Sequence, residues 1–114
     1  MPFTKRNIFT EKNTFGRDAE YFEEILQAEN VRIQRIVSYG QTSDWYDQEE
    51  DEWVLLLSGE ASLEFENDHQ IKMEEGDFVF LSAHQRHKVT QTSTDPPCVW
   101  LAVFGHFQIN TPHE

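Results

Sequence analysis

Apolar and polar residues alternate with a period of two in several short runs after residue 30. The first alternating run covers residues 31–37 and is rich in β-branched side chains. Two further runs, 61–66 and 70–74, flank a polar turn, which predicts a hairpin. Residues 53–57 are apolar throughout, as expected of a strand that is covered on both faces. These patterns predict a series of short β-strands.

Three more strands are predicted in the second half of the chain, at 78–81, 87–92 and 99–104. Turns rich in Gly, Pro, Asn and Asp separate the strands, and little helix is available to connect parallel neighbours. The sequence therefore predicts an all-β fold, a small antiparallel β-barrel or jelly roll. Residues 20–27 fit either a helical face or the first strand of a hairpin with 31–37, and the strand is favoured.

The length of 114 residues suits one domain. The pattern divides the chain into an N-terminal arm with a first hairpin or short helix (1–30), a barrel (31–107) and a tail (108–114). Scattered apolar side chains occur along the arm: Phe3, Ile8, Phe9 and Phe15. Such an arm, together with the edge strands of a small barrel, favours association of two copies, so a homodimer is expected.

The charge balance excludes some classes of partner. The chain has 21 acidic and 9 basic residues, a formal net charge of −12, which repels phosphate backbones and anionic membrane surfaces. We therefore expect neither a nucleic acid nor a membrane as a partner, and no apolar run approaches the about 20 residues of a membrane span. Cys98 is the single cysteine and no leader pattern is seen, so a cytoplasmic location is expected.

Two groups of residues carry a resemblance to a known family. Gly40, Glu52 and Gly59 have the spacing of the first motif of the cupin superfamily, and Gly76 and His87 have the spacing of the ends of its second motif. The residues from Glu52 to Glu60 also strongly resemble this motif in many small bacterial cupins. The resemblance extends from the first alternating run to the last predicted strand. It implies a cupin barrel with a small-molecule pocket inside, in a family that contains both enzymes and non-catalytic proteins.

The resemblance also implies a candidate metal site. In metal-binding cupins, two histidines and a glutamate of the first motif and a histidine of the second hold one divalent ion. The matching positions here are occupied by Tyr46, Gln48, Glu52 and His87. Glu52 and His87 are ordinary ligands for Zn, Fe, Mn or Ni, whereas Gln48 offers a neutral oxygen and Tyr46 binds a metal poorly unless deprotonated. A divalent metal is thus a predicted cofactor, and no organic cofactor is indicated.

Neighbouring residues offer alternatives. A bulge before Glu52 would turn Asp47 inward and give an Asp/Glu/His group suited to Fe, Mn or Zn. His84, in the loop before His87, would complete such a site or contact the substrate, or else it is an exposed loop residue. In a pocket without metal, Glu52 and His87 would act as an acid/base pair, with Tyr46 as a hydrogen-bond donor.

Two functions stay open on the sequence. One is a small metal-dependent enzyme that acts on a compact polar metabolite, with Tyr46 or His84 near the substrate. The other is a non-catalytic, metal-free barrel that binds or senses a small ligand. The acidic cluster at 44–52 favours the first function, and the absence of both first-motif histidines favours the second.

Overall fold

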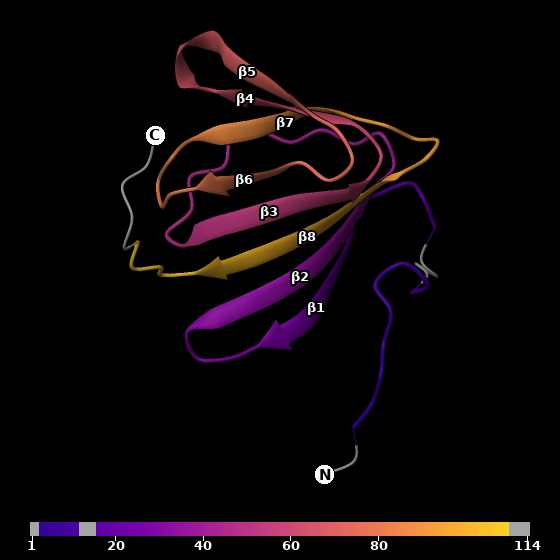
Figure 1. Ribbon diagram of the computed structural model, residues 1–114. Helices are drawn as coiled ribbons and strands as arrows, with labels where there is room; N and C mark the ends of the chain where they lie inside the picture. The colour runs from indigo at the N-terminus through magenta and orange to yellow at the C-terminus, as the bar shows by residue number, and fades with distance from the viewer. Residues whose placement is uncertain (1–2, 12–15, 110–114) are drawn as a thin grey trace.

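The structure is a computed structural model that describes residues 3–11 and 16–109, and it consists of two antiparallel sheets that face each other (Figure 1). The five-stranded sheet has the order β1-β2-β8-β3-β6, and the three-stranded sheet has the order β5-β4-β7. The strands are β1 (Tyr21–Gln27), β2 (Val31–Ser38), β3 (Asp51–Ser58), β4 (Ala61–Phe65), β5 (His69–Met73), β6 (Phe78–Leu81), β7 (His87–Thr92) and β8 (Cys98–Gly105). The all-β prediction is confirmed. In the part of the chain described, no helix is long and apolar enough to cross a membrane.

The predicted hairpin forms because its turn suits its residues. β4 and β5 pair antiparallel over their full lengths and are joined by one 3-10 turn, Glu66–Asp68. Asn67 and Asp68 in this turn have positive φ angles of 68° and 60°, a conformation that Asn and Asp tolerate better than most residues. β1 also pairs antiparallel with β2, so residues 20–27 contribute a strand and not a helix.

The core lies between the sheets, on the faces that the alternation directs inward. Leu56 of β3, Met73 of β5 and Ala102 of β8 are almost fully buried there. Cys98 is buried as well, and its thiol donates a hydrogen bond to the carbonyl oxygen of Glu60 at 3.0 Å. Close packing of these groups holds the two sheets at a fixed separation.

Strand β3 differs from its prediction on one face. Val54 and Leu56 point inward and are buried, but Trp53 and Leu55 on the opposite face are only half-buried. The apolar run 53–57 is therefore not explained by cover on both faces from the described residues of this chain.

In the described part of the predicted segment 1–30, an arm precedes β1, and β2 to β8 lie within the predicted segment 31–107. β1 pairs with β2 in the same sheet, across the boundary between these two segments. Phe15, one of the apolar residues noted in the arm, and the tail residues 110–114 lie outside the described residues.

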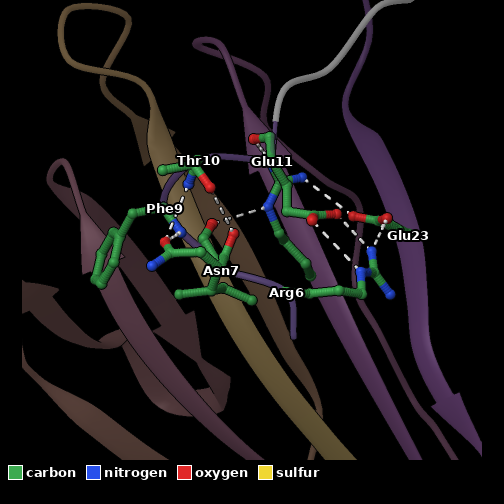
Figure 2. A network of polar contacts seen from close by, with 8 residues as sticks. Arg6, Asn7, Phe9, Thr10, Glu11 and Glu23 are labelled. Atoms are coloured by element: carbon green, nitrogen blue, oxygen red, sulfur yellow. Dashed lines mark hydrogen bonds and ion pairs between the residues drawn. The ribbon is translucent and has the colours of Figure 1, made fainter. Parts of the chain in front are cut away.

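A buried arginine fixes the arm to the sheet. Arg35 of β2 is 3% exposed, and its guanidinium donates to the backbone carbonyl oxygens of Ile8 (3.3 Å) and Glu11 in the arm. It also pairs with Glu23 of β1 at 3.3 Å. Arg6 of the arm reaches the carboxylates of Glu11 and Glu23 at 2.5 and 2.7 Å (Figure 2). The arm is thus held by charge-assisted hydrogen bonds at several points.

Candidate ligand-binding cavity

A cavity of about 230 Å³ lies between the two sheets. Its walls come from the inner faces of β2, β3 and β8 on one side and from β4 and β7 on the other. Apolar lining residues include Ile36, Val54, Leu63, Leu81, Trp100 and Phe104. Four of the predicted site residues also line the cavity: Tyr46, Gln48, Glu52 and His87. The structure therefore brings together one polar cluster within a largely apolar wall, the usual composition of a small-molecule site.

Glu52 is a buried carboxyl group on the inner face of β3. It is 8% exposed, and one of its oxygens accepts a hydrogen bond from the amide of Gln48 at 3.1 Å. Burial disfavours the charged form and raises the pKa of Glu52 from its ordinary value of 4.5 to about 7, although the Gln48 hydrogen bond and Arg32 work in the opposite direction. Near neutral pH this group therefore exists in both protonation states.

His87 begins β7, where it is linked to Tyr46 by an isolated antiparallel bridge with N–O distances of 2.6 and 3.2 Å. Its Nδ1 lies 3.0 Å from the carbonyl oxygen of Gln85, which can only accept, so Nδ1 carries the proton and Nε2 is left as the acceptor. Burial lowers the pKa of His87, and the Gln85 carbonyl opposes this shift. The centres of the Tyr46 and His87 rings are 5.3 Å apart. His87 thus presents a neutral imidazole beside a phenol.

Arg32 is a lining residue that the sequence reasoning missed. Its guanidinium binds the Glu50 carboxylate at 2.7 and 3.2 Å, reaches Glu24 at 3.4 Å, and lies 4.3 Å from the centre of the Phe104 ring. The hydrogen bonds with Glu50 raise the pKa of Arg32 and lower that of Glu50. The sequence did contain an indication of this position, because Arg32 and Ile36 are four residues apart on one strand and therefore point to the same face.

Two predicted site residues, Asp47 and His84, are not among the residues that line the cavity. The Asp47 carboxylate accepts a hydrogen bond from Nδ1 of His84 at 2.8 Å, and both side chains are exposed. Tyr46 and Gln48 take the inward positions, so Asp47 between them points outward; no inward bulge is formed. His84 pairs with Asp47 and is not one of the residues that line the cavity.

The polar cluster does not fit the metal site implied by the family pattern. Glu52 and His87 are the two ordinary metal ligands in it, and Gln48 turns its N–H group toward Glu52. Among the residues that the structure describes, no three His, Cys, Asp or Glu side chains form a group able to hold a metal ion. Protein sites for Zn, Fe, Mn or Ni normally use at least three such ligands. The fit is poor because Tyr46 and Gln48 stand at the two positions where the family motif has histidines.

Two facing antiparallel sheets with a cavity lined from both define a small β-barrel with a hollow interior. The profile of the cupin domain family matches residues 35–104 of the chain. The chain belongs to the cupin family. The resemblance to cupins that the two motifs carry is thus confirmed. No curated protein matches the chain significantly.

Solved structures of other proteins have a similar fold. A protein of Ralstonia eutropha JMP134, described as a "putative mannose-6-phosphate isomerase", is 37% identical, with 91% of this chain and 99% of that chain covered and a TM-score of 0.83. A cupin superfamily protein of Desulfitobacterium hafniense DCB-2 is 17% identical, covers 94% and 95% of the two chains and has a TM-score of 0.77. An RmlC-like cupin protein of Desulfovibrio desulfuricans is 19% identical, covers 90% and 97%, and has a TM-score of 0.73.

Proposed function

We propose that the protein binds a small organic molecule without net negative charge in the barrel interior, and that it does so without a metal ion. The observation that carries the proposal is the buried Glu52 carboxyl, which faces a cavity whose wall is otherwise mostly apolar. With a pKa of about 7, it can donate as the neutral acid or accept as the carboxylate. The neutral His87 adds an acceptor at Nε2. Such a cluster suits a ligand with hydroxyl, amide or amine groups at one end.

The charges around the cavity disfavour an anion. Among the described lining residues there is one arginine, Arg32, and no lysine. Its guanidinium is already bound to Glu50 and Glu24. Glu20 and Glu52 add acidic groups to the same wall. An anionic ligand would enter a region of negative potential without an available cation, whereas a neutral or cationic ligand would not meet this cost.

The description of the Ralstonia protein suggests a sugar phosphate as an alternative ligand. Phosphate groups are generally held by unpaired Arg or Lys side chains or by clusters of backbone N–H groups. Because Arg32 is paired, we expect the phosphorylated sugar to bind more weakly than the neutral sugar.

The test is a thermal-shift and calorimetry screen of purified protein against neutral sugars and polyols, small amines, and sugar phosphates including mannose 6-phosphate. A ligand at 100 times its dissociation constant should stabilise the fold by about 2.7 kcal/mol. We expect stabilisation by a neutral or cationic compound in the presence of a chelator, loss of this effect in Glu52→Ala, and its retention in Glu74→Ala, which removes an exposed carboxylate. Binding of sugar phosphates alone would contradict the proposal.

Elemental analysis of the native protein tests the metal-free part separately. We expect a content of divalent metal far below one ion per chain, with no change in melting temperature after chelation. About one ion per chain, removed by Glu52→Ala or His87→Ala, would show instead that the metal predicted from the family pattern is present.

One observation favours a second candidate function, acid–base turnover of the bound molecule. Glu52 can exchange a proton near neutral pH, and the neutral His87 lines the same cavity. A general acid or base works best when its pKa is close to the pH at which it operates. Mass spectrometry of the ligand recovered after incubation distinguishes the two functions, because a binding protein returns the ligand unchanged.

A further inference from the structure

The cavity has a second acidic group, Glu20, at a distance from Glu52. Glu20 lines the cavity just before β1, and its side chain is bound to Ser38 at the end of β2. Glu52 lies at the other end of the sheet, in the row of paired residues that includes Arg32 at the start of β2. Ser38 and Arg32 are six residues apart on β2, which corresponds to about 20 Å along the strand. The two carboxyl groups therefore mark two different ends of the inner face.

Uncharged hydrogen-bond donors hold the Glu20 carboxylate in place. The hydroxyl of Ser38, which is fully buried, donates to Oε2 of Glu20 at 2.5 Å. The same hydroxyl accepts a hydrogen bond from the indole Nε1 of Trp100 at 3.2 Å. These bonds orient the carboxylate without neutralising its charge. In the described part of the chain, no Arg, Lys or His side chain forms an ion pair with Glu20. A cation is thus the group that this end of the cavity lacks.

Aromatic rings lie around the same end of the cavity. Phe22, Ile36 and Trp100 are neighbours across β1, β2 and β8, in the inward row next to that of Ser38. Phe22 and Trp100 line the cavity, as does Tyr46 from the loop before β3. Phe22 is 52% exposed and Tyr46 is 39% exposed, so both rings also reach the surface and border the mouth of the cavity. The faces of aromatic rings carry partial negative charge and attract ammonium groups.

The negative charge of Glu20 acts on Tyr46. Burial raises the pKa of Tyr46 above its ordinary value of 10, and the charges of Glu20 and Glu52 raise it further, against a hydrogen bond with Ser43. The ring is therefore a neutral phenol near neutral pH, and it lies within electrostatic reach of both carboxyl groups. A cation at the mouth of the cavity would be attracted by the Glu20 carboxylate and by the Tyr46 ring together.

The wall between the two ends is apolar. Val54 of β3, Leu63 of β4 and Val89 of β7 line this part of the cavity, which has a volume of about 230 Å³. Apolar side chains favour an apolar ligand body of similar shape, because contact between them removes both surfaces from water. A molecule that matches the whole cavity therefore has a cationic group at the Glu20 end and an apolar body.

We propose that the ligand of the barrel is an organic cation, whose ammonium group lies beside Glu20 among the rings of Phe22, Tyr46 and Trp100. This inference rests on the proposed function, because it concerns the same cavity. The proposed function admits neutral ligands, whereas this inference requires a positive charge. The formal net charge of −12 also attracts cations to the chain from solution.

Pairs of compounds that share a shape and differ in charge test the proposal. Benzylamine is compared with benzyl alcohol, cyclohexylamine with cyclohexanol, and choline with 3,3-dimethylbutanol. Isothermal titration calorimetry of the unmodified protein, at neutral pH and with a chelator present, gives the affinity for each compound. We expect at least one amine to bind at least about tenfold more tightly than its neutral counterpart, because only the amine gains the carboxylate and the ring faces.

Variants of two acidic residues locate the charge. Glu20→Gln keeps the size of the side chain and can still accept the hydrogen bond from Ser38. It should weaken binding of the amine by about fivefold to tenfold and change binding of the neutral counterpart by less than about twofold. Asp18→Asn removes the same charge two residues away, at an exposed position that does not line the cavity, and should leave both affinities unchanged. Phe22→Leu, at an exposed ring, should weaken the amine about threefold.

Three outcomes would overturn the inference. Failure of all three amines to bind, or equal affinity for amines and neutral compounds, would show that a positive charge is not required. Binding of the neutral compounds in either case would leave the proposed function intact, whereas binding of sugar phosphates alone would contradict both. An amine that binds the folded Glu20→Gln variant as tightly as the unmodified protein would show that its ammonium group does not lie beside Glu20.

Discussion

Replacing Glu52 by Gln should change how the stability of the protein depends on pH. Glutamine keeps the size of the side chain and can still accept the hydrogen bond from Gln48, but it has no proton to lose. In the native protein, burial raises the pKa of Glu52 from 4.5 to about 7. Between these two pH values the folded chain keeps the proton and the unfolded chain releases it. The stability of the unmodified protein therefore falls, relative to Glu52→Gln, as the pH rises through this window.

The size of the effect follows from the shift. A difference of 2.5 between the two pKa values (7 − 4.5), at about 1.36 kcal/mol per unit, corresponds to about 3 kcal/mol over the whole titration. From about pH 5 to about pH 8, the free energy of unfolding of the unmodified protein should fall by roughly 2 to 3 kcal/mol relative to that of Glu52→Gln. We compare the free energy of unfolding of Glu52→Gln with that of the unmodified protein. This difference should be larger, in favour of Glu52→Gln, above about pH 7 than at about pH 5, by the amount given.

Urea denaturation of both proteins at several pH values measures the difference, and subtraction removes the groups that titrate equally in both. Glu74→Gln, at an exposed position, controls for the loss of one negative charge. If the difference between Glu52→Gln and the unmodified protein stays constant within about 1 kcal/mol from about pH 5 to about pH 8, Glu52 does not have the raised pKa on which the reasoning depends.

Three further predictions concern stability and the arm. Gly59→Ala should lower the free energy of unfolding, measured by urea denaturation, by at least about 1 kcal/mol more than Gly76→Ala. Both glycines have a φ angle of 90°, so the backbone strain is shared. A Cβ on Gly59 would lie 2.7 Å from Ser93 Oγ, whereas a Cβ on Gly76 would have none of the surrounding atoms within 4 Å. Leu56→Ala should cost about 2 to 5 kcal/mol, because this side chain is fully buried in the core; a loss below about 1 kcal/mol would contradict the assigned packing. Arg35→Met should release the arm, so limited proteolysis should cleave it faster than in the unmodified protein while the barrel persists.

The alternation in the sequence and the turn residues between the runs were enough to predict the strands. In β3 the continuous apolar run hid the face, and only the structure shows Glu52, Val54 and Leu56 together on the buried side. The motif spacing added the family and the location of the cavity. It did not settle the chemistry of the site, because two of its metal-ligand positions are occupied by Tyr46 and Gln48.

The loop before β3 was not predictable in the same way. It lacks a regular period, so the choice between Asp47 and Gln48 as the inward residue depends on the bridge between Tyr46 and His87, two residues far apart in the sequence. The pairing of Asp47 with His84 is likewise a contact between distant segments. No local pattern encodes which of two neighbouring polar residues in a loop faces a cavity.

The sequence by itself determined the strands, the family and the polar residues available to the site, because these depend on local periodicity, residue type and spacing. Only the tertiary structure decided that Arg32 is paired and that Glu52 is desolvated. Each of these properties results from strands that are distant in sequence and adjacent in the sheet, where burial and neighbouring charges set the behaviour of a side chain.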